Sequence, residues 1–573
     1  MHDVVIKGGT VVDGTGAPPR TADVALAGGR IVAVGRVDEP ARETVDATGL
    51  LVTPGYVDPH THYDGQATWD PLLRPSSAHG VTTAILGNCG VGFAPVRPER
   101  RAWLVQLMEG VEDIPGTALH EGIRWAWESF PEYLDALASL PRAMDVAAHV
   151  PHGALRGYVM DERGADDEAA TDADLARMAE LVEEAVRAGA IGFSTNRLPS
   201  HTARDGRPVP GTMAEPTELM AIARAVAAGG GGVIQAVSAE GMGLVPGGYR
   251  RDLEWMTEVS IATGLRTTLA VTQHNVQPEL WRDVLDWVDE AAAAGARVTP
   301  QVSGRPLGIL LGWSTRHQFS GRPSYDEVAH LPLAERVVAL ADPERRARIL
   351  AEPATPGLAT LVAKLSNQLF PLYDPPDYEP PAERSVKALA AATGRTVDEA
   401  LYELYQEEGG RRLVLFTLGG YAHHHADHIV EMLERPGTML GLADGGAHCS
   451  LICDASTYTS MLSYWARDRT RGRRLPVELA VAKMTSVPAD LYGLADRGRL
   501  VPGLRADVNV IDPVRLRVRM PEVVNDLPGG ASRVLQGAEG YVRTFVAGEA
   551  VTIDDTDTGA RPGRLVRRGS TVA

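Results

Sequence analysis

Eight short apolar segments, each followed by a polar or glycine-rich end, recur along the middle of the chain. Stretches with helical spacing, such as residues 174–186 and 281–294, separate several of them. Strands that alternate with helices are typical of a parallel sheet. The pattern therefore predicts an α/β fold with a (β/α)8 TIM-like barrel, whose functional residues lie at the C-terminal strand ends. The eight predicted strands are residues 56–59, 82–86, 144–148, 190–194, 233–237, 266–272, 297–302 and 439–443.

Both ends of the chain contain strand-like segments with glycine turns, and 573 residues are too many for one compact core. We expect a small β-sandwich domain built from both termini, formed by residues 1–54 and 481–573. The barrel would then occupy residues 55–480. An insertion of about residues 306–437, with proline-rich loops and helices, separates the seventh and eighth strands and could cover the functional site.

Charge and composition exclude several classes of partner. The net charge of −18 argues against nucleic acid, because phosphate binding needs a basic surface. No apolar run reaches the length of a membrane span, and the N-terminus lacks the features of a signal peptide. The three cysteines, Cys89, Cys449 and Cys453, cannot form a disulfide framework. These features predict a cytoplasmic protein that binds neither nucleic acid nor membrane.

His60 and His62 follow the apolar run of residues 50–57. Side chains alternate along a strand, so imidazoles at positions i and i+2 point to the same face. Two nitrogen ligands would then lie side by side at the C-terminal end of a buried strand. The alternative is a pair of polar residues in a surface loop. We interpret the pair as half of a divalent metal site.

Three further polar residues fall at predicted strand ends. Cys89 follows the second strand, His274 ends the sixth and Asp444 ends the eighth. A lone buried cysteine is usually a small apolar side chain, and a lone histidine is usually a hydrogen-bonded one. Because all three positions lie at one mouth of the predicted barrel, their agreement favours a shared metal site.

With these motifs the chain resembles the amidohydrolase superfamily, and specifically the N-acyl-D-amino-acid deacylases, over nearly its full length. The Gly87–Gly90 segment, Gly-Asn-Cys-Gly, carries the resemblance most specifically, because most of the superfamily bridges its metals with a carboxylated lysine. None of the four lysines lies at the end of a predicted barrel strand. The resemblance thus implies a Cys89 thiolate as the replacement, a soft ligand that suits Zn²⁺. The other matching motifs are His60-Thr61-His62, residues 80–83, 443–445 and 503–507.

The resemblance implies a zinc-dependent amidohydrolase that cleaves an amide C–N bond of an N-acyl amino acid or a related small molecule. One or two Zn²⁺ ions would activate water by lowering its pKa towards ~7. Asp444 would move protons between that water and the leaving nitrogen. One alternative is an enzyme acting on a cyclic amide or another acyl-nitrogen substrate; a second is a catalytically inactive barrel scaffold or binding protein. The implied metal ligands are His60, His62, Cys89, His274 and Asp444.

The chain also departs from the deacylases at three points. No histidine follows the fifth strand, where Gln235 and Glu240 stand, and Asn275 follows His274 where some members have a lysine. The loop after Asp444 lacks the arginine that holds the substrate carboxylate in the family. We expect Arg305 to serve as a substitute anion clamp. The other predicted substrate contacts are His149, His152 and His448. A homo-oligomer is common for such barrels, although no residue identifies one.

Overall fold

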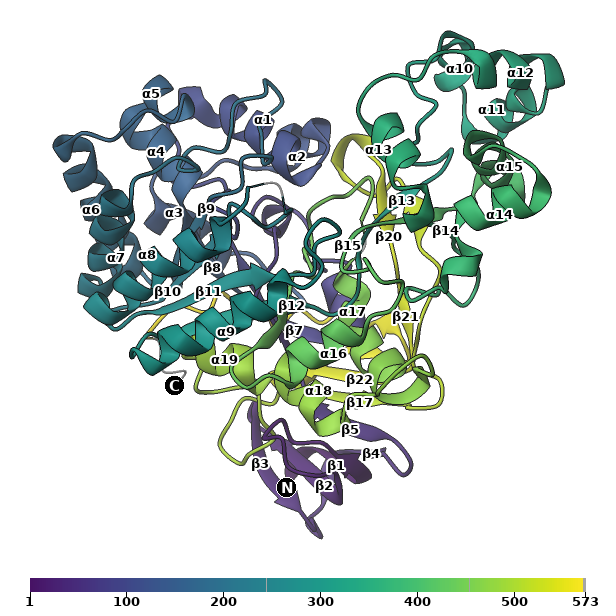
Figure 1. Cartoon of the computed structure of the whole chain (residues 1–573). Helices are drawn as coiled ribbons and strands as arrows, with labels where there is room; N and C mark the ends of the chain where they lie inside the picture. Colours follow the sequence, from purple (N-terminus) through teal and green to yellow (C-terminus); the bar gives the residue numbers. More distant parts are fainter. Residues whose placement is uncertain (244, 453, 570–573) are drawn as a thin grey trace.

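The computed structural model describes residues 1–243, 245–452 and 454–569. Figure 1 shows three parts: a central barrel, a sheet at the N-terminal end of the chain, and a lobe formed by the insertion. Cys453 lies outside the described residues, whereas Cys89 and Cys449 are buried and free. Within the described residues, no helix combines the length and the apolar character needed to cross a bilayer.

Eight parallel strands form the barrel, at the positions expected from the sequence. The first and last strands do not share a ladder, but the chain just past their ends joins them: the Asp444 amide donates to His60 O and the His62 amide donates to Gly445 O. The predicted fold class is confirmed. In spatial order the strands are β16 (Met439–Gly441), β12 (Val298–Ser303), β11 (Arg266–Val271), β10 (Val233–Val237), β9 (Gly192–Asn196), β8 (Asp145–Pro151), β7 (Val81–Leu86) and β6 (Tyr56–Asp58).

Amphipathic helices cover the outside of the barrel. In α6 (Asp172–Arg187), Thr171 and Asp174 form a capping box, and the buried Met178, Val182 and Ala185 recur at helical spacing. This one-sided apolar stripe explains why one face of the helix packs into the apolar core. The other helices on this part of the chain are α1 (Arg101–Glu112), α2 (Gly116–Gly122), α3 (Phe130–Ala138), α4 (His152–Met160), α5 (Glu162–Ala165), α7 (Pro216–Ala228), α8 (Gly248–Thr263) and α9 (Leu280–Ala293).

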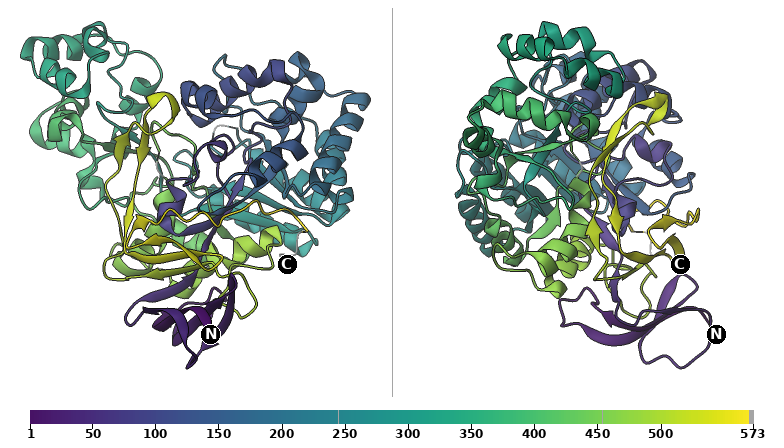
Figure 2. Two further views of the ribbon diagram at one scale, coloured as in Figure 1. Left: turned by 180° about the vertical axis from the view of Figure 1, so that it is seen from behind. Right: turned by 90° about the vertical axis from the view of Figure 1, so that its right-hand side faces the viewer.

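Strands from both termini form one nine-stranded sheet with its own apolar core, visible from behind in Figure 2. β5 (Leu51–Pro54) pairs with the C-terminal β17 (Val508–Ile511) and leads into β6 through Gly55. A Cβ at Gly55 would lie 2.3 Å from the Thr82 hydroxyl, so only glycine fits there. The remaining strands are β1 (His2–Val11), β2 (Arg20–Ala27), β3 (Arg30–Gly35), β4 (Ala41–Asp46), β22 (Tyr541–Val546), β23 (Glu549–Ile553) and β24 (Thr556–Asp557).

Two helices lie across the predicted boundary at residue 481. α18 (Val477–Met484) contains that position, and α19 (Ser486–Tyr492) follows it. Both pack against the barrel strands β6 and β16. The barrel therefore extends beyond residue 480, and the C-terminal part of the sheet begins only at β17.

The insertion between β12 and β16 forms a lobe with a separate apolar core around Trp313. Its three-stranded antiparallel sheet has the order β13 (Leu307–Leu311), β15 (Val414–Gly419), β14 (Leu369–Pro371). The chain then returns to the barrel through α16 (Asp427–Glu434). The helices of the lobe are α10 (Pro323–Ala329), α11 (Leu333–Leu340), α12 (Pro343–Ala351), α13 (Leu358–Lys364), α14 (Val386–Thr393) and α15 (Val397–Gly410).

Candidate active site

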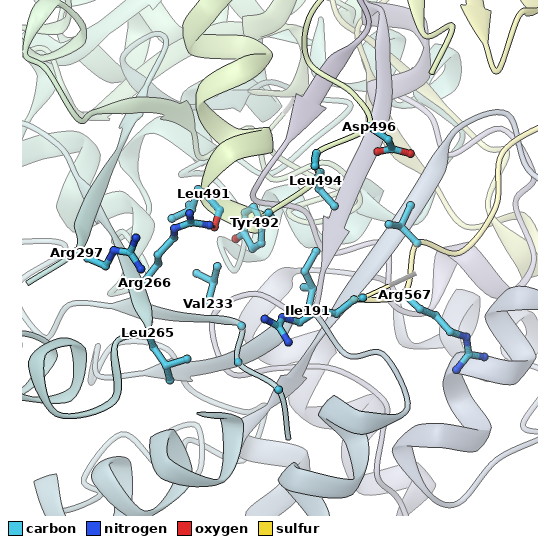
Figure 3. Close-up of a pocket in the computed structure, with 18 of the residues that line it drawn as sticks. Ile191, Val233, Leu265, Arg266, Arg297, Leu491, Tyr492, Leu494, Asp496 and Arg567 are labelled. Carbon is cyan, nitrogen blue, oxygen red and sulfur yellow. The ribbon is translucent and has the colours of Figure 1, made fainter. Parts of the chain in front are cut away.

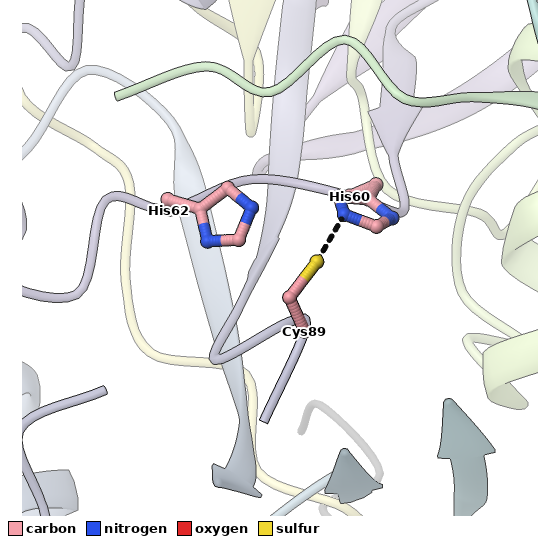
Figure 4. A group of neighbouring side chains, drawn as sticks. All are labelled: His60, His62 and Cys89. Carbon is pink, nitrogen blue, oxygen red and sulfur yellow. Dashed lines mark hydrogen bonds between the residues drawn. The ribbon is translucent and has the colours of Figure 1, made fainter. Parts of the chain in front are cut away.

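Three potential metal ligands meet at the C-terminal ends of β6 and β7. One ligand atom from each of His60, His62 and Cys89 lies within 4.8 Å of the other two. Figure 4 shows both imidazoles beside the thiol, with His60 Nε2 3.1 Å from Cys89 Sγ. All three side chains are buried. The spacing that suggested a shared face for the two histidines thus brings them together with the cysteine of the next strand.

Gln301 on β12 orients the His60 ring. Its Oε1 lies 2.9 Å from His60 Nδ1, so Nδ1 carries the proton and Nε2 keeps its lone pair towards Cys89. Gln301 is itself held by a hydrogen bond to Thr268 of β11. Burial lowers the pKa of His60 to about 4, which keeps the ring neutral and able to bind a metal.

Cys89 lies in a tight turn whose backbone is held by a hydrogen bond to a side chain of β10. Its φ of 56° is left-handed, and its amide donates to Gln235 Oε1 of β10 at 2.9 Å. Gln235, on the strand without the expected histidine, therefore supports the cysteine turn. Burial, and then the charges of Glu112 and Asp444, raise the pKa of Cys89 well above its usual range. A thiolate at this position consequently needs a cation beside it, which fits the donor set to a bound metal.

Asp444 follows the last barrel strand, β16, and lies close to His60 and His62 at the end of the first strand, β6. The hydrogen bonds that connect β6 to the end of β16 place its Oδ1 3.4 Å from His60 Nε2 and 3.8 Å from His62 Nε2. Its backbone is left-handed, with a φ of 48°. Burial raises the pKa of this carboxyl to about 6. A carboxyl group that titrates near neutrality can both accept and donate a proton.

Glu112, the last residue of α1, is a buried carboxylate that the sequence interpretation missed. Its Oε1 lies 3.5 Å from His62 Nδ1, and its Oε2 lies 3.7 Å from His448 Nε2. Glu112 lies on the same buried face of α1 as Leu104 and Met108. A carboxyl group on an otherwise apolar helix face is costly to bury, and this signal in the sequence could have identified Glu112 as a functional residue. Because Glu112 lies beside Nδ1 of His62, the other ring nitrogen, Nε2, points towards Asp444.

Two more histidines approach the group. His448 is about a quarter exposed and therefore lies at its rim. His201, in the loop after β9, has a buried ring nitrogen without a hydrogen-bond partner. Burial, and then the neighbouring charges of His60, His448 and His201, lower the pKa of His62. The lowered pKa keeps the His62 ring neutral and able to bind a metal.

The structure does not bring His274 into this cluster. Its ring stacks on Tyr249 with 5.7 Å between centroids, and neither ring nitrogen has a hydrogen-bond partner. The largest neighbouring charge is that of Glu240. Among the described residues, the only group of three such ligands is formed by His60, His62 and Cys89. His274 is therefore not part of that group, and its role as a metal ligand stays a prediction.

Three predicted substrate contacts are already engaged elsewhere. Arg305 is buried and binds Asp454 at 2.6 Å, and it also donates to Ser456. His149 is buried, with Nε2 3.1 Å from the Tyr492 hydroxyl. Both nitrogens of His152 are occupied, by Thr195 and by Glu218. These contacts are typical of side chains that hold the fold, so the anion clamp expected at Arg305 is not formed.

The contacts of His152 lead to a stability prediction for Glu218. Burial opposes the charge of Glu218, but His152 and Arg156 outweigh it and lower its pKa to about 2. The ion pair with Arg156 thus stabilises the fold fully above pH ~4.5 and is lost as the pH falls towards ~2. Glu218→Gln should cost about 3 kcal/mol at pH 7, because Arg156 stays buried.

Thermal unfolding from pH 7 to pH 3 tests this prediction. The difference in midpoint between wild type and Glu218→Gln should shrink as the pH falls below ~4.5. Glu180→Gln is the control, since its pair with Arg177 is exposed and is worth at most about 1 kcal/mol. Equal midpoints for wild type and Glu218→Gln at pH 7 would contradict the prediction.

Comparisons with known proteins place the whole chain beside amidohydrolases. The model of the Amidohydrolase family matches residues 43–552. D-aminoacylase from Alcaligenes xylosoxydans xylosoxydans is 28% identical, over 99% of this chain and 98% of the relative. A solved D-aminoacylase with a binuclear metal centre covers 99% of this chain and all of its own, with a TM-score of 0.66 and 24% identity. N-acyl-D-glutamate deacylase from Bordetella bronchiseptica, solved with zinc and a phosphonate inhibitor, covers 99% of both chains, with a TM-score of 0.65 and 24% identity. The family match spans most of the sequence, and the chain therefore belongs to the Amidohydrolase family.

Proposed function

We propose that this protein is a zinc-dependent amidohydrolase that cleaves the amide bond of an N-acyl amino acid or a related small molecule. The observation that carries the proposal is the convergence of His60, His62 and Cys89 with Asp444 at the barrel mouth. The D-aminoacylase and N-acyl-D-glutamate deacylase relatives support the substrate class.

We assign one zinc ion to this site, held by His60 Nε2, His62 Nε2 and Cys89 Sγ, with Asp444 beside them. Nitrogen and sulfur donors are the ligands that Zn²⁺ prefers in proteins. When bound, the ion would act as a Lewis acid on the substrate carbonyl and lower the pKa of a water molecule. A single ion is favoured because Gln235 supports the Cys89 turn and His274 lies outside the cluster.

Asp444 has the position and the acidity of the proton carrier. Its carboxylate lies within 4 Å of both ligand nitrogens, so it faces the place where water and substrate would meet. It would take a proton from the attacking water and return one to the leaving nitrogen. Gln301 and Glu112 would hold the two imidazoles in the required orientation.

A substrate panel tests the proposed function. Zinc-loaded protein is incubated with N-acyl-D-amino acids, their L-enantiomers and cyclic amides, and released amine or carboxylate is measured. Hydrolysis of at least one N-acyl amino acid is the expected result. Hydrolysis of cyclic amides alone would favour a second candidate function, that of a cyclic-amide hydrolase. The observation in its favour is the ion pair between Arg305 and Asp454, because this arginine is already occupied and does not face an α-carboxylate of the substrate. No hydrolysis of any compound would contradict both.

Glu112→Gln should weaken zinc binding by about 10- to 100-fold, because it replaces the carboxyl group 3.5 Å from His62 Nδ1 by a neutral amide. Competition with a chromogenic chelator measures the zinc dissociation constant. Glu109→Gln on the same helix is the control, since that carboxylate pairs with Arg204. An unchanged zinc affinity in Glu112→Gln would remove Glu112 from the orientation of His62.

A further inference from the structure

A cavity of about 840 Å³ lies at the N-terminal face of the barrel, at the end opposite to the candidate zinc site. Val233 and Arg266 begin β10 and β11, Arg297 precedes β12, and all three line it. Figure 3 shows Leu491 and Tyr492 of α19 above these strand starts. The volume falls in the range of small-molecule sites.

The charge of the cavity wall is strongly one-sided. Five arginines line it, and Asp496 is its single acidic residue. Asp496 is paired with Arg497 at 2.9 Å, so its charge is already neutralised. The five lining arginines are Arg30, Arg266, Arg297, Arg567 and Arg568. In a chain of net charge −18, this local excess of positive charge is the reverse of the overall balance.

Three of these guanidinium groups have no carboxylate partner among the described residues: those of Arg266, Arg297 and Arg568. Arg266 donates to the carbonyls of Asp490 and Leu491 at 2.7 and 3.0 Å. Arg297 donates to the carbonyl of Gly264 at 3.3 Å. A guanidinium has five N–H donors, so each side chain is positioned by the backbone with donors to spare.

Arg568 completes the wall from the C-terminal segment. Its guanidinium lies against Gly230 and Gly231, where a Cβ would come within 3.0 and 2.9 Å of its nitrogens. Burial, and then the nearby charge of Arg266, lower the pKa of Arg568. Like charges held this close repel each other, and a bound anion would relieve that repulsion.

We propose that this cavity binds a small phosphate-bearing anion. Phosphate oxygens match the planar donor fork of arginine, which binds them in pairs. The volume of the cavity suits a small molecule, and the net charge of the chain opposes a polyanion such as nucleic acid. The proposal is independent of the proposed function, because the lining residues include no member of the candidate zinc site.

Calorimetric titration with inorganic phosphate tests the proposal. Wild type should bind one equivalent saturably, and Arg297→Glu and Arg568→Glu should each weaken binding by about tenfold or more. Both side chains are exposed, so these variants should fold. Arg251→Glu is the control, since Arg251 is exposed and outside the cavity.

A variant with weakened zinc binding distinguishes phosphate binding at this cavity from phosphate binding at the zinc site. In Cys89→Ala, phosphate binding at the arginine cavity should persist with the wild-type affinity. Three outcomes would overturn the proposal: no saturable binding up to about 10 mM phosphate, equal binding by wild type and the double variant Arg297→Glu/Arg568→Glu, or loss of binding in Cys89→Ala.

Discussion

Asp444→Asn is expected to lower kcat by about 10²- to 10⁴-fold, the usual contribution of a general acid–base group. The amide keeps the shape of the carboxyl group but cannot accept a proton from water. His60, His62 and Cys89 are untouched, so zinc content should stay near the wild-type value. Steady-state kinetics with zinc analysis of the same samples measure both quantities.

Asp444→Glu separates chemistry from position. The longer carboxylate can still carry a proton, so it should retain more activity than Asp444→Asn. An unchanged kcat in Asp444→Asn would remove this residue from proton transfer. Loss of zinc in the same variant would instead make Asp444 chiefly a ligand, which its distance of 3.4 Å from His60 Nε2 also permits.

Cys89→Ala should weaken zinc binding by more than about 100-fold and reduce activity in proportion, because it removes the one anionic sulfur from the cluster. Cys449→Ala is a closely matched control. Both thiols are free and equally buried, at 5% exposure, but Cys449 lies outside the cluster. Zinc content by elemental analysis and hydrolysis of the best substrate in the panel are measured for both variants.

The control defines what would contradict this prediction. Both substitutions create a small buried cavity of similar size, so a general loss of stability should affect them alike. If Cys449→Ala loses zinc as Cys89→Ala does, the effect is on the fold. If Cys89→Ala keeps zinc, the thiol is no ligand and His60 and His62 must bind the metal with other partners.

Much of the barrel could be predicted from sequence because its strands are buried on both faces and read as continuous apolar runs. The positions of His60, His62 and Cys89 followed from the rule that such strands expose their C-terminal ends at one mouth. That rule is local to each strand. It needs no knowledge of which distant segments touch, and the three side chains do meet at that mouth; their role as metal ligands stays a prediction.

The failures involve contacts that a local rule cannot see. Arg305 meets Asp454, a residue 149 positions away, and this ion pair removes it from the site. His274 stacks on Tyr249 of the preceding helix, a contact that its own strand end does not reveal. Glu112 comes from the end of a helix, where the strand-end rule does not apply.

Titration of the metal-free protein with Zn²⁺ tests the central claim most directly, with hydrolysis of an N-acyl amino acid followed at each addition. The account predicts that activity rises to a plateau at about one equivalent, the capacity of the His60–His62–Cys89 group. A plateau only at two equivalents would contradict the single-ion site. No zinc binding and no hydrolysis would contradict the metal-dependent amidohydrolase itself.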